Sequence, residues 1–194
     1  MTTSFTPKVE LFGGAITVDI PNGFADVSNI RQVPDHQEVY IDVNGYTSII
    51  FEITEHVEKD QASTDEEAIK YHLDDIAEEP GDRLEIWSLD SVRFEKIAPS
   101  YSSYTILATH KPQQQPQRPP NPQHTTILLT LLRLPEKKTD ILITINIPYI
   151  PSEAAREQID FEAGNFGSHV EAMKEVRERV LKSFEIRDWG LFDA

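Results

Sequence analysis

Two carboxylates stand three positions apart in VPDHQEV, the segment from Val33 to Val39. Asp35 and Glu38 follow a proline and lie at the start of a predicted strand, where an ordinary turn needs only one Asp or Gly. Paired carboxylates can carry acid–base hydrolysis, or they can pair with basic groups of a partner protein. They can equally be solvated turn residues, and the residue types alone leave these interpretations open.

The common signatures of catalysis and cofactor binding are absent from the sequence. It contains no GxGxxG, GxxxxGK[ST], GxSxG or HExxH pattern and no cysteine. Among 33 acidic residues, carboxylate pairs say nothing specific about hydrolysis. His72 and Asp75 stand three apart in a predicted helix, but such a pair is more often a solvated helix face than a metal site. We therefore expect a non-enzymatic protein with no catalytic residue, no metal and no cofactor.

The charge of the chain restricts its partners. Asp and Glu total 33 against 18 Lys and Arg, a net charge of −15. Such a protein is a poor ligand for nucleic-acid phosphates and for anionic membranes. A basic protein partner is its electrostatic complement, although acidic residues also serve solubility alone. We expect no signal peptide and no membrane span, and the lack of cysteine fits the cytosol or nucleus.

The elements that would position Asp35 and Glu38 are mainly strands. Residues 9–20 predict one or two short strands, followed by a turn at Pro-Asn-Gly. Residues 25–33 can form a helical turn, which the proline after Val33 ends. The alternation in EVYID predicts a half-buried strand with Val39 and Ile41 on one face, and Glu38, Tyr40 and Asp42 on the other.

More strands follow in adjacent runs. Asn44-Gly45 predicts a two-residue hairpin turn. The later strand patterns cover residues 47–57, 83–97, 101–111, 125–134 and 139–150. The Pro/Gln-rich segment 111–123 has strands on both sides, so it predicts a flexible, extended hairpin loop rather than a domain boundary. Its PxxP elements could bind an SH3 domain, but a flexible insertion is the simpler interpretation.

Two helices are indicated. Residues 64–79 combine helical spacing with a capping box at Thr64 and Glu67 and stop at Pro-Gly. Residues 168–186 have a second capping box at Ser168 and Glu171. Their predicted apolar stripe consists of Val170, Met173, Val176, Val180, Leu181 and Phe184. The apolar tail that follows, RDWGLFDA, is expected to dock on the domain.

These patterns predict one α+β domain over residues 1–194. Consecutive strands joined by hairpin signals favour a mostly antiparallel sheet of six or seven strands. The continuous apolar character of 125–134 and 139–150 predicts strands covered on both faces, so that helices flank the sheet as an α/β/α sandwich.

The stretch from Leu11 to Asp42 resembles the N-terminal signature of the Ran guanine-nucleotide release factors, the Mog-type Ran-binding proteins of nuclear transport. That pattern is LFGG or LYGG, a P-x-G turn, D-x-S, and L-R-x-V-P-D-x-Q-E-V. The chain supplies Leu11, Phe12, Gly13, Gly14, Ala15, Pro21, Gly23, Asp26, Ser28, Arg31, Val33, Pro34, Asp35, Gln37, Glu38 and Val39.

The resemblance extends over most of the chain. LLRLPEKKTDILITINIP, residues 131–148, is similar to the central hairpin of the family, and IRDWGLFDA, residues 186–194, to its C-terminal ending. The departures are Ile30 in place of Leu, a poorly matched 111–123 loop, and a short hairpin at Asn44-Gly45 where some relatives carry a longer acidic insertion. Any role of that insertion is therefore in doubt here.

The resemblance implies a fold shared with the PsbP proteins and a function. The family binds the GTPase Ran and promotes release of its nucleotide, mainly GTP, in nucleocytoplasmic protein transport. This implies Ran and other Ran-binding proteins as candidate partners and a location in nucleus and cytoplasm. The implied Ran-contacting residues are Asp35 and Glu38, with Arg31, Pro34, Gln37 and Tyr40 as neighbours.

Alternatives to this function remain. An acidic interaction or trafficking scaffold could bind another basic protein without releasing nucleotide. An extrinsic photosystem-type subunit would need a transit peptide, which we do not find. Arg31 could simply pair with Asp35 to hold the loop, and Gly13 and Gly14 are expected to be structural.

Overall fold

The computed structural model describes residues 3–76, 82–113, 122–151 and 159–193. Its strands are β1 (Phe5–Leu11), β2 (Ile16–Pro21), β3 (Phe24–Asp26), β4 (Gln37–Asp42), β5 (Ser48–Glu55), β6 (Arg83–Ser91), β7 (Ser103–Lys111), β8 (His124–Leu134), β9 (Thr139–Tyr149) and β10 (Glu185–Ile186). The α-helices are α1 (Asp65–Ile76) and α2 (Ser168–Ser183), and the 3-10 turns are η1 (Phe12–Gly14), η2 (Val27–Asn29), η3 (Pro135–Lys137) and η4 (Trp189–Phe192).

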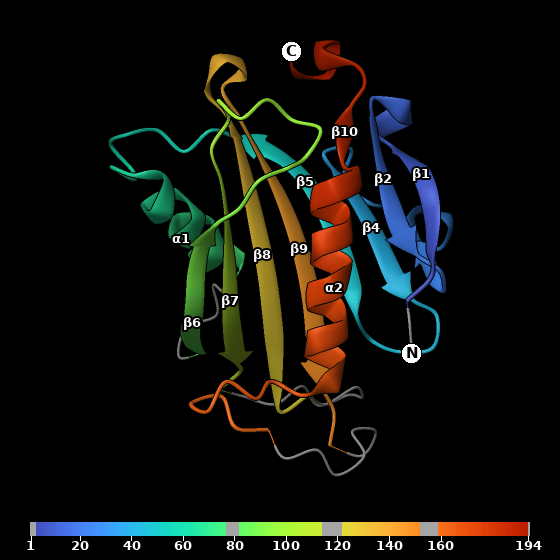
Figure 1. Cartoon of the computed structure of the whole chain (residues 1–194), viewed down its shortest axis with the longest axis vertical. Coiled ribbons are helices and arrows are strands. Elements are labelled where there is room, and N and C mark those ends of the chain that lie inside the picture. The colour runs from blue at the N-terminus through green and yellow to red at the C-terminus, as the bar shows by residue number, and fades with distance from the viewer. Residues whose placement is uncertain (1–2, 77–81, 114–121, 152–158, 194) are drawn as a thin grey trace.

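Seven strands form one antiparallel sheet in the order β3-β4-β5-β9-β8-β7-β6. The predicted antiparallel α+β architecture is confirmed. Figure 1 shows α2 on the front face of this sheet, beside β1 and β2, with α1 toward the opposite face and edge. Strands β8 and β9 occupy the centre, and they are buried almost along their whole length because both faces are covered.

Each face of the sheet has its own apolar core. The α2 side contains Leu128, Leu132 and the predicted stripe of α2, all of which is buried as expected. The α1 side contains Leu129, Leu131 and, from α1, Ile69 and Leu73. Alternate residues of β8 therefore enter different cores, which explains why that strand is apolar at successive positions.

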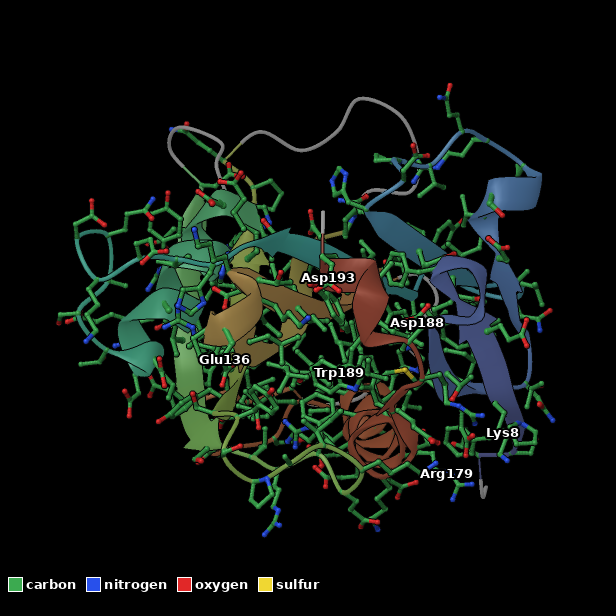
Figure 2. All side chains as sticks on the ribbon, turned by 90° about the horizontal axis from the view of Figure 1, so that it is seen from above. Lys8, Glu136, Arg179, Asp188, Trp189 and Asp193 are labelled. Atoms are coloured by element: carbon green, nitrogen blue, oxygen red, sulfur yellow. The ribbon has the colours of Figure 1, made fainter. Side chains whose placement is uncertain are left out.

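A second sheet of three strands, β1-β2-β10, was not predicted. Asp19 of β2 ties it to α2, since its carboxylate accepts hydrogen bonds from Arg179 Nε at 2.7 Å and from the backbone N–H of Lys8 at 3.0 Å. Figure 2 shows Lys8 and Arg179 on the side where α2 meets β1. Ser183 Oγ also accepts the N–H of Asp19 at 3.0 Å. The small sheet is thereby fixed against the end of α2.

A buried polar cluster lies under α1 and corrects the prediction for His72. That histidine is buried, not on a solvated helix face, and its Nε2 lies 3.0 Å from Asp140 Oδ2. His56 Nδ1 lies 2.9 Å from Asp140 Oδ1, and Arg133 Nε donates to the same oxygen at 3.1 Å. Asp75, the other half of the predicted pair, is exposed.

The tail after α2 docks as predicted. Trp189 stacks on Tyr101 with ring centroids 5.7 Å apart, and Phe192 is buried against the core. Figure 2, viewed from above, shows Trp189 near the middle of this end of the molecule, with Asp188 and Asp193 beside it. The apolar side chains of the tail therefore close this end of the domain.

Several local predictions were wrong. Helix α2 has Gly167 as its N-cap with no side-chain cap, so Ser168 and Glu171 form no capping box. In α1, half of the predicted capping box is confirmed, because the Thr64 hydroxyl accepts the N–H of Glu67 at 3.2 Å. The Glu67 carboxylate accepts the N–H of Ser63 at 2.7 Å. The β4–β5 loop spans 43–46, because the N–H of Asp42 still pairs with Thr47 O. Residues 77–79 of the predicted first helix and 114–121 of the Pro/Gln loop lie outside the described residues.

Candidate functional site

The segment that leads to the two carboxylates begins at a capped 3-10 turn. Asp26 ends β3, and its carboxylate accepts the backbone N–H and the hydroxyl of Ser28, both at 2.7 Å. This is the physical basis of the Asp-x-Ser pattern, since the aspartate satisfies a free N–H at the start of η2. After this turn, Ile30 and Arg31 lie exposed at the surface.

Asp35 lies in a tight turn from Pro34 to Gln37, closed by the N–H of Gln37 donating to Pro34 O at 2.9 Å. Pro34 and Asp35 are both exposed. The turn is anchored on β5, where the N–H of Ile53 donates to His36 O at 2.9 Å. The Asp35 carboxylate makes no hydrogen bond or ion pair with the described part of the chain. The backbone hydrogen bonds of the turn thus hold Asp35 at the surface, where water hydrates its carboxylate.

The residue beside this turn on β5 is Glu52. Gln37 is paired with Glu52 across the strands, and its Nε2 donates to Glu52 Oε1 at 3.1 Å. His36 Nε2 lies 3.6 Å from the same oxygen. These contacts hold Gln37 and keep a third carboxylate close to the turn, which sequence analysis did not identify.

Glu38 is the first acidic residue of β4, and its environment differs from that of Asp35. It is half-buried, and its Oε1 accepts the backbone N–H of Phe12 at 2.6 Å. The two acidic residues therefore do not play equal parts. Asp35 keeps both oxygens toward solvent, while Glu38 already uses one oxygen inside the molecule.

Tyr40 is not available as a surface contact. Its side chain is 7% exposed and packs edge-to-face on Phe51 with ring centroids 6.4 Å apart. Burial, with the negative charges of Asp26 and Glu38, raises the pKa of Tyr40 to about 12. Val39 is buried as predicted, but the opposite face of EVYID is not solvated, because Tyr40 enters the core beside α2 and packs on Phe51 of β5.

The remaining predicted residues share one stretch of surface. Arg31, Pro34 and Asp35 are exposed, and Gln37 is half-buried beside them. Arg31 makes no ion pair with Asp35, so the loop is held by its backbone hydrogen bonds rather than by that pair. Ile30, which is 71% exposed, adds an apolar side chain to this surface that sequence analysis did not identify.

This arrangement suits binding. An exposed carboxylate beside an exposed aliphatic residue and a proline can pair with a basic partner group and bury apolar area around it. Across the described ranges, no group of three metal-ligating side chains gathers in a way that could hold a metal ion. In the same part of the chain, no helix is long and apolar enough to cross a membrane.

Comparison with known proteins gives a consistent result. Residues 9–148 match the model of a family described as "Ran-interacting Mog1 protein". The chain is 33% identical, over 95% of each chain, to a Dictyostelium discoideum protein named "Probable ran guanine nucleotide release factor". It is 30% identical to the Saccharomyces cerevisiae nuclear import protein MOG1, covering 95% of this chain and 84% of that one. The crystal structure of the S. cerevisiae Ran-binding protein Mog1p superimposes with a TM-score of 0.76 at 27% identity, covering 98% of this chain and 100% of that one.

Proposed function

Because the chain belongs to the family of Ran-interacting Mog1 proteins, we propose that it binds Ran and promotes release of bound guanine nucleotide, mainly GTP. Its relatives carry the names Ran guanine nucleotide release factor and nuclear import protein. The chain would accordingly act in nucleocytoplasmic protein transport and be present in both nucleus and cytoplasm. It would act as a regulatory binding protein rather than an enzyme, with residues 1–194 forming one Ran-binding domain.

The observation that carries this proposal is the Asp35 carboxylate, which is exposed on a turn anchored to β5 and has no hydrogen-bond or ion-pair partner among the residues that the structure describes. Keeping a carboxylate hydrated costs the free protein nothing, and a basic group of Ran can replace the water. Asp35 and Glu38 are the proposed principal contacts. Arg31, Pro34 and Gln37 would contribute beside them, and Tyr40 would act only by supporting β4 from the core.

Nucleotide release needs no covalent chemistry in this mechanism. A small GTPase holds the phosphates with a lysine, backbone N–H groups and Mg²⁺. A carboxylate brought close to that site can pair with the lysine and disfavour the anionic nucleotide and its metal. If the protein binds nucleotide-free Ran more tightly than loaded Ran, linkage requires that it weaken nucleotide binding by the same factor.

The test is the rate at which a fluorescent GTP analogue leaves Ran, measured without addition, with the wild-type protein and with an Asp35→Ala/Glu38→Ala double variant. We expect faster release with the wild type and little acceleration with the variant. The matched control is Asp74→Ala/Asp75→Ala, which removes the same two charges from the exposed side of α1. General electrostatic attraction changes equally in both double variants, so the control should still accelerate release strongly while Asp35→Ala/Glu38→Ala should not.

Two results would contradict the proposal in different ways. Unchanged release with the wild type would exclude the release function and favour the alternative of an acidic scaffold for another basic protein. Equal activity of the wild type and the Asp35→Ala/Glu38→Ala variant would retain the function but place the contact surface elsewhere.

A further inference from the structure

The turn between β1 and β2 has an unusual backbone. Phe12, Gly13 and Gly14 have φ angles of 50°, 65° and 92°, so three successive residues lie in the left-handed region. Glycine adopts such angles freely, but a phenylalanine does so only when its surroundings impose it. The conformation of this turn therefore depends on contacts made by Phe12.

Glu38 supplies one of those contacts. Its Oε1 accepts the N–H of Phe12 at 2.6 Å, across 26 residues of chain and between the two sheets. On the following side of the turn, Ala15 O accepts the N–H groups of Arg187 and Asp188 at 2.8 and 3.1 Å. The strand residues that flank the turn, Leu11 and Ile16, are fully buried. The turn is thus held at its base while Gly13 is exposed at its tip.

The same hydrogen bond fixes where the turn lies. Glu38 follows directly after the Pro34–Gln37 turn that presents Asp35. A backbone group bonded to the Glu38 carboxylate must lie within one side-chain length of β4 at that end. The Phe12–Gly14 turn consequently borders the surface that contains Asp35.

We propose that the Phe12–Gly14 turn is a second part of the surface that contacts Ran, and that Glu38 acts as a positioning residue that holds it. This inference rests on the proposed function. The two acidic residues then have different roles. The Asp35 carboxylate pairs with a basic group of Ran, and Glu38 holds the backbone of the turn in the conformation that Ran contacts. Removing Glu38 would then weaken binding by a route that charge alone does not explain.

A substitution at Gly13 tests contact by the turn directly. A Cβ added there would have no atom within 4 Å, and asparagine tolerates left-handed angles. Gly13→Asn therefore adds a side chain into open space, with a residue type that keeps the strain of the left-handed backbone small. Gly23→Asn is the matched control, because Gly23 has a φ of 91°, equally open surroundings and a place in a different turn, after β2. We expect Gly13→Asn to weaken binding to nucleotide-free Ran at least tenfold and Gly23→Asn less than twofold.

The positioning role is tested with Glu38→Gln and Glu38→Ala. Glutamine keeps a carbonyl oxygen that can accept the N–H of Phe12 but loses the charge, whereas alanine loses both. We expect hydrogen exchange at the Phe12 amide of the free protein to be within threefold of wild type in Glu38→Gln and at least tenfold faster in Glu38→Ala. Binding to Ran should be at least fivefold weaker in Glu38→Ala than in Glu38→Gln.

Each experiment can contradict one part of the proposal. If the wild type binds Ran and Gly13→Asn binds equally well, the turn is not part of the contact surface. If Glu38→Gln and Glu38→Ala match in amide exchange and in affinity, Glu38 acts through its charge and not as a positioning residue. Failure of the wild type to bind Ran would instead overturn the proposed function, and this inference with it.

Discussion

Arg133 of β8 and Asp140 of β9 lie directly opposite each other, both buried, and Arg133 Nε donates to Asp140 Oδ1 at 3.1 Å. The second carboxylate oxygen accepts the N–H of Val57 at 3.0 Å and lies 3.0 Å from His72 Nε2. Arg133 Nη1 also donates to Asp65 Oδ1 at 2.6 Å, at the edge of the cluster. Because Arg133 and Asp140 are both buried, removing either one leaves the other poorly compensated.

Asp140→Ala is expected to lower the free energy of unfolding by about 3–5 kcal/mol. It removes the more deeply buried of the two carboxylates that face Arg133, leaving only Asp65, and it removes the acceptor for the N–H of Val57 and the partner of His72. Urea denaturation measures the change. Asp74→Ala, on the exposed side of α1, should change stability by less than about 0.5 kcal/mol. A loss below about 1 kcal/mol for Asp140→Ala would show that water enters the cluster and solvates Arg133.

Stability should fall in acid partly because of the same aspartate. Burial by itself raises the pKa of Asp140, but hydrogen bonds from His72 and Val57 and the charge of Arg133 outweigh it and hold the pKa below the ordinary value of 3.8. A lowered folded-state pKa gives stability that is present above the unfolded-state pKa and lost as pH falls through the folded-state pKa. The stability difference between wild type and Asp140→Asn should therefore shrink below about pH 4. A difference that stays constant down to about pH 2 would contradict this assignment.

Tyr40 should be the tyrosine that ionises at strongly alkaline pH. Its pKa is raised to about 12 by burial and by Asp26 and Glu38, so the folded protein keeps the neutral phenol while the unfolded chain ionises near 10. Stability from this source is present below pH 10 and is lost as pH rises toward 12. Ultraviolet titration of tyrosinate should lose its step near pH 12 in Tyr40→Phe. The step should persist in Tyr46→Phe, whose side chain is 46% exposed.

Ile30 should contribute to Ran binding without contributing to stability. It is 71% exposed, next to Arg31 at the surface described above. Truncating an apolar residue inside a protein interface commonly costs about 1 kcal/mol, so Ile30→Ala should weaken binding about fivefold. Val43→Ala is the control, because Val43 is 60% exposed at the other end of β4. Equal affinities of the two variants would exclude Ile30 from the contact surface.

The docked tail should stabilise the domain through Trp189. This side chain stacks on Tyr101 and lies 6.1 Å from Phe192 between ring centroids. Trp189→Ala should lower the free energy of unfolding by about 2 kcal/mol, and Trp189→Phe by less, because a smaller ring keeps part of the stacking. Thermal unfolding of the two variants would test this order. Equal stabilities of both variants would mean that the aromatic contact contributes little.

Elements whose residues share one environment along their length were predictable. Strands β8 and β9 and the buried stripe of α2 follow from uninterrupted patterns, and the structure confirms them. For β4 the burial of Val39 was predicted but that of Tyr40 on the opposite face was not, because the ring of Tyr40 contacts Phe51, on a different strand. The small sheet was missed because β10 has only two residues and pairs with a strand from the other end of the chain.

Within the candidate site, the local turn was predictable from the sequence, but the contacts between distant residues were not. The turn at Asp35 followed from the proline before it, and the structure places that carboxylate at the surface. Nothing local could reveal that Glu38 bonds to Phe12, since the two residues meet only when β1 and β4 are both folded. His72 was assigned to solvent because its partner, Asp140, lies 68 positions away.

The tie between β2 and the end of α2 has a consequence for how the protein is made. Asp19 is bonded to Ser183 across 164 positions, and β10 pairs with β2. During synthesis, β1 and β2 must therefore wait, unpaired on one side, until residues 179–186 have left the ribosome. The hydrogen bonds from Arg187 and Asp188 to Ala15 O, on the following side of the Phe12–Gly14 turn, can form only then. The last part of the chain to be synthesised thus completes the support of a turn close to its beginning.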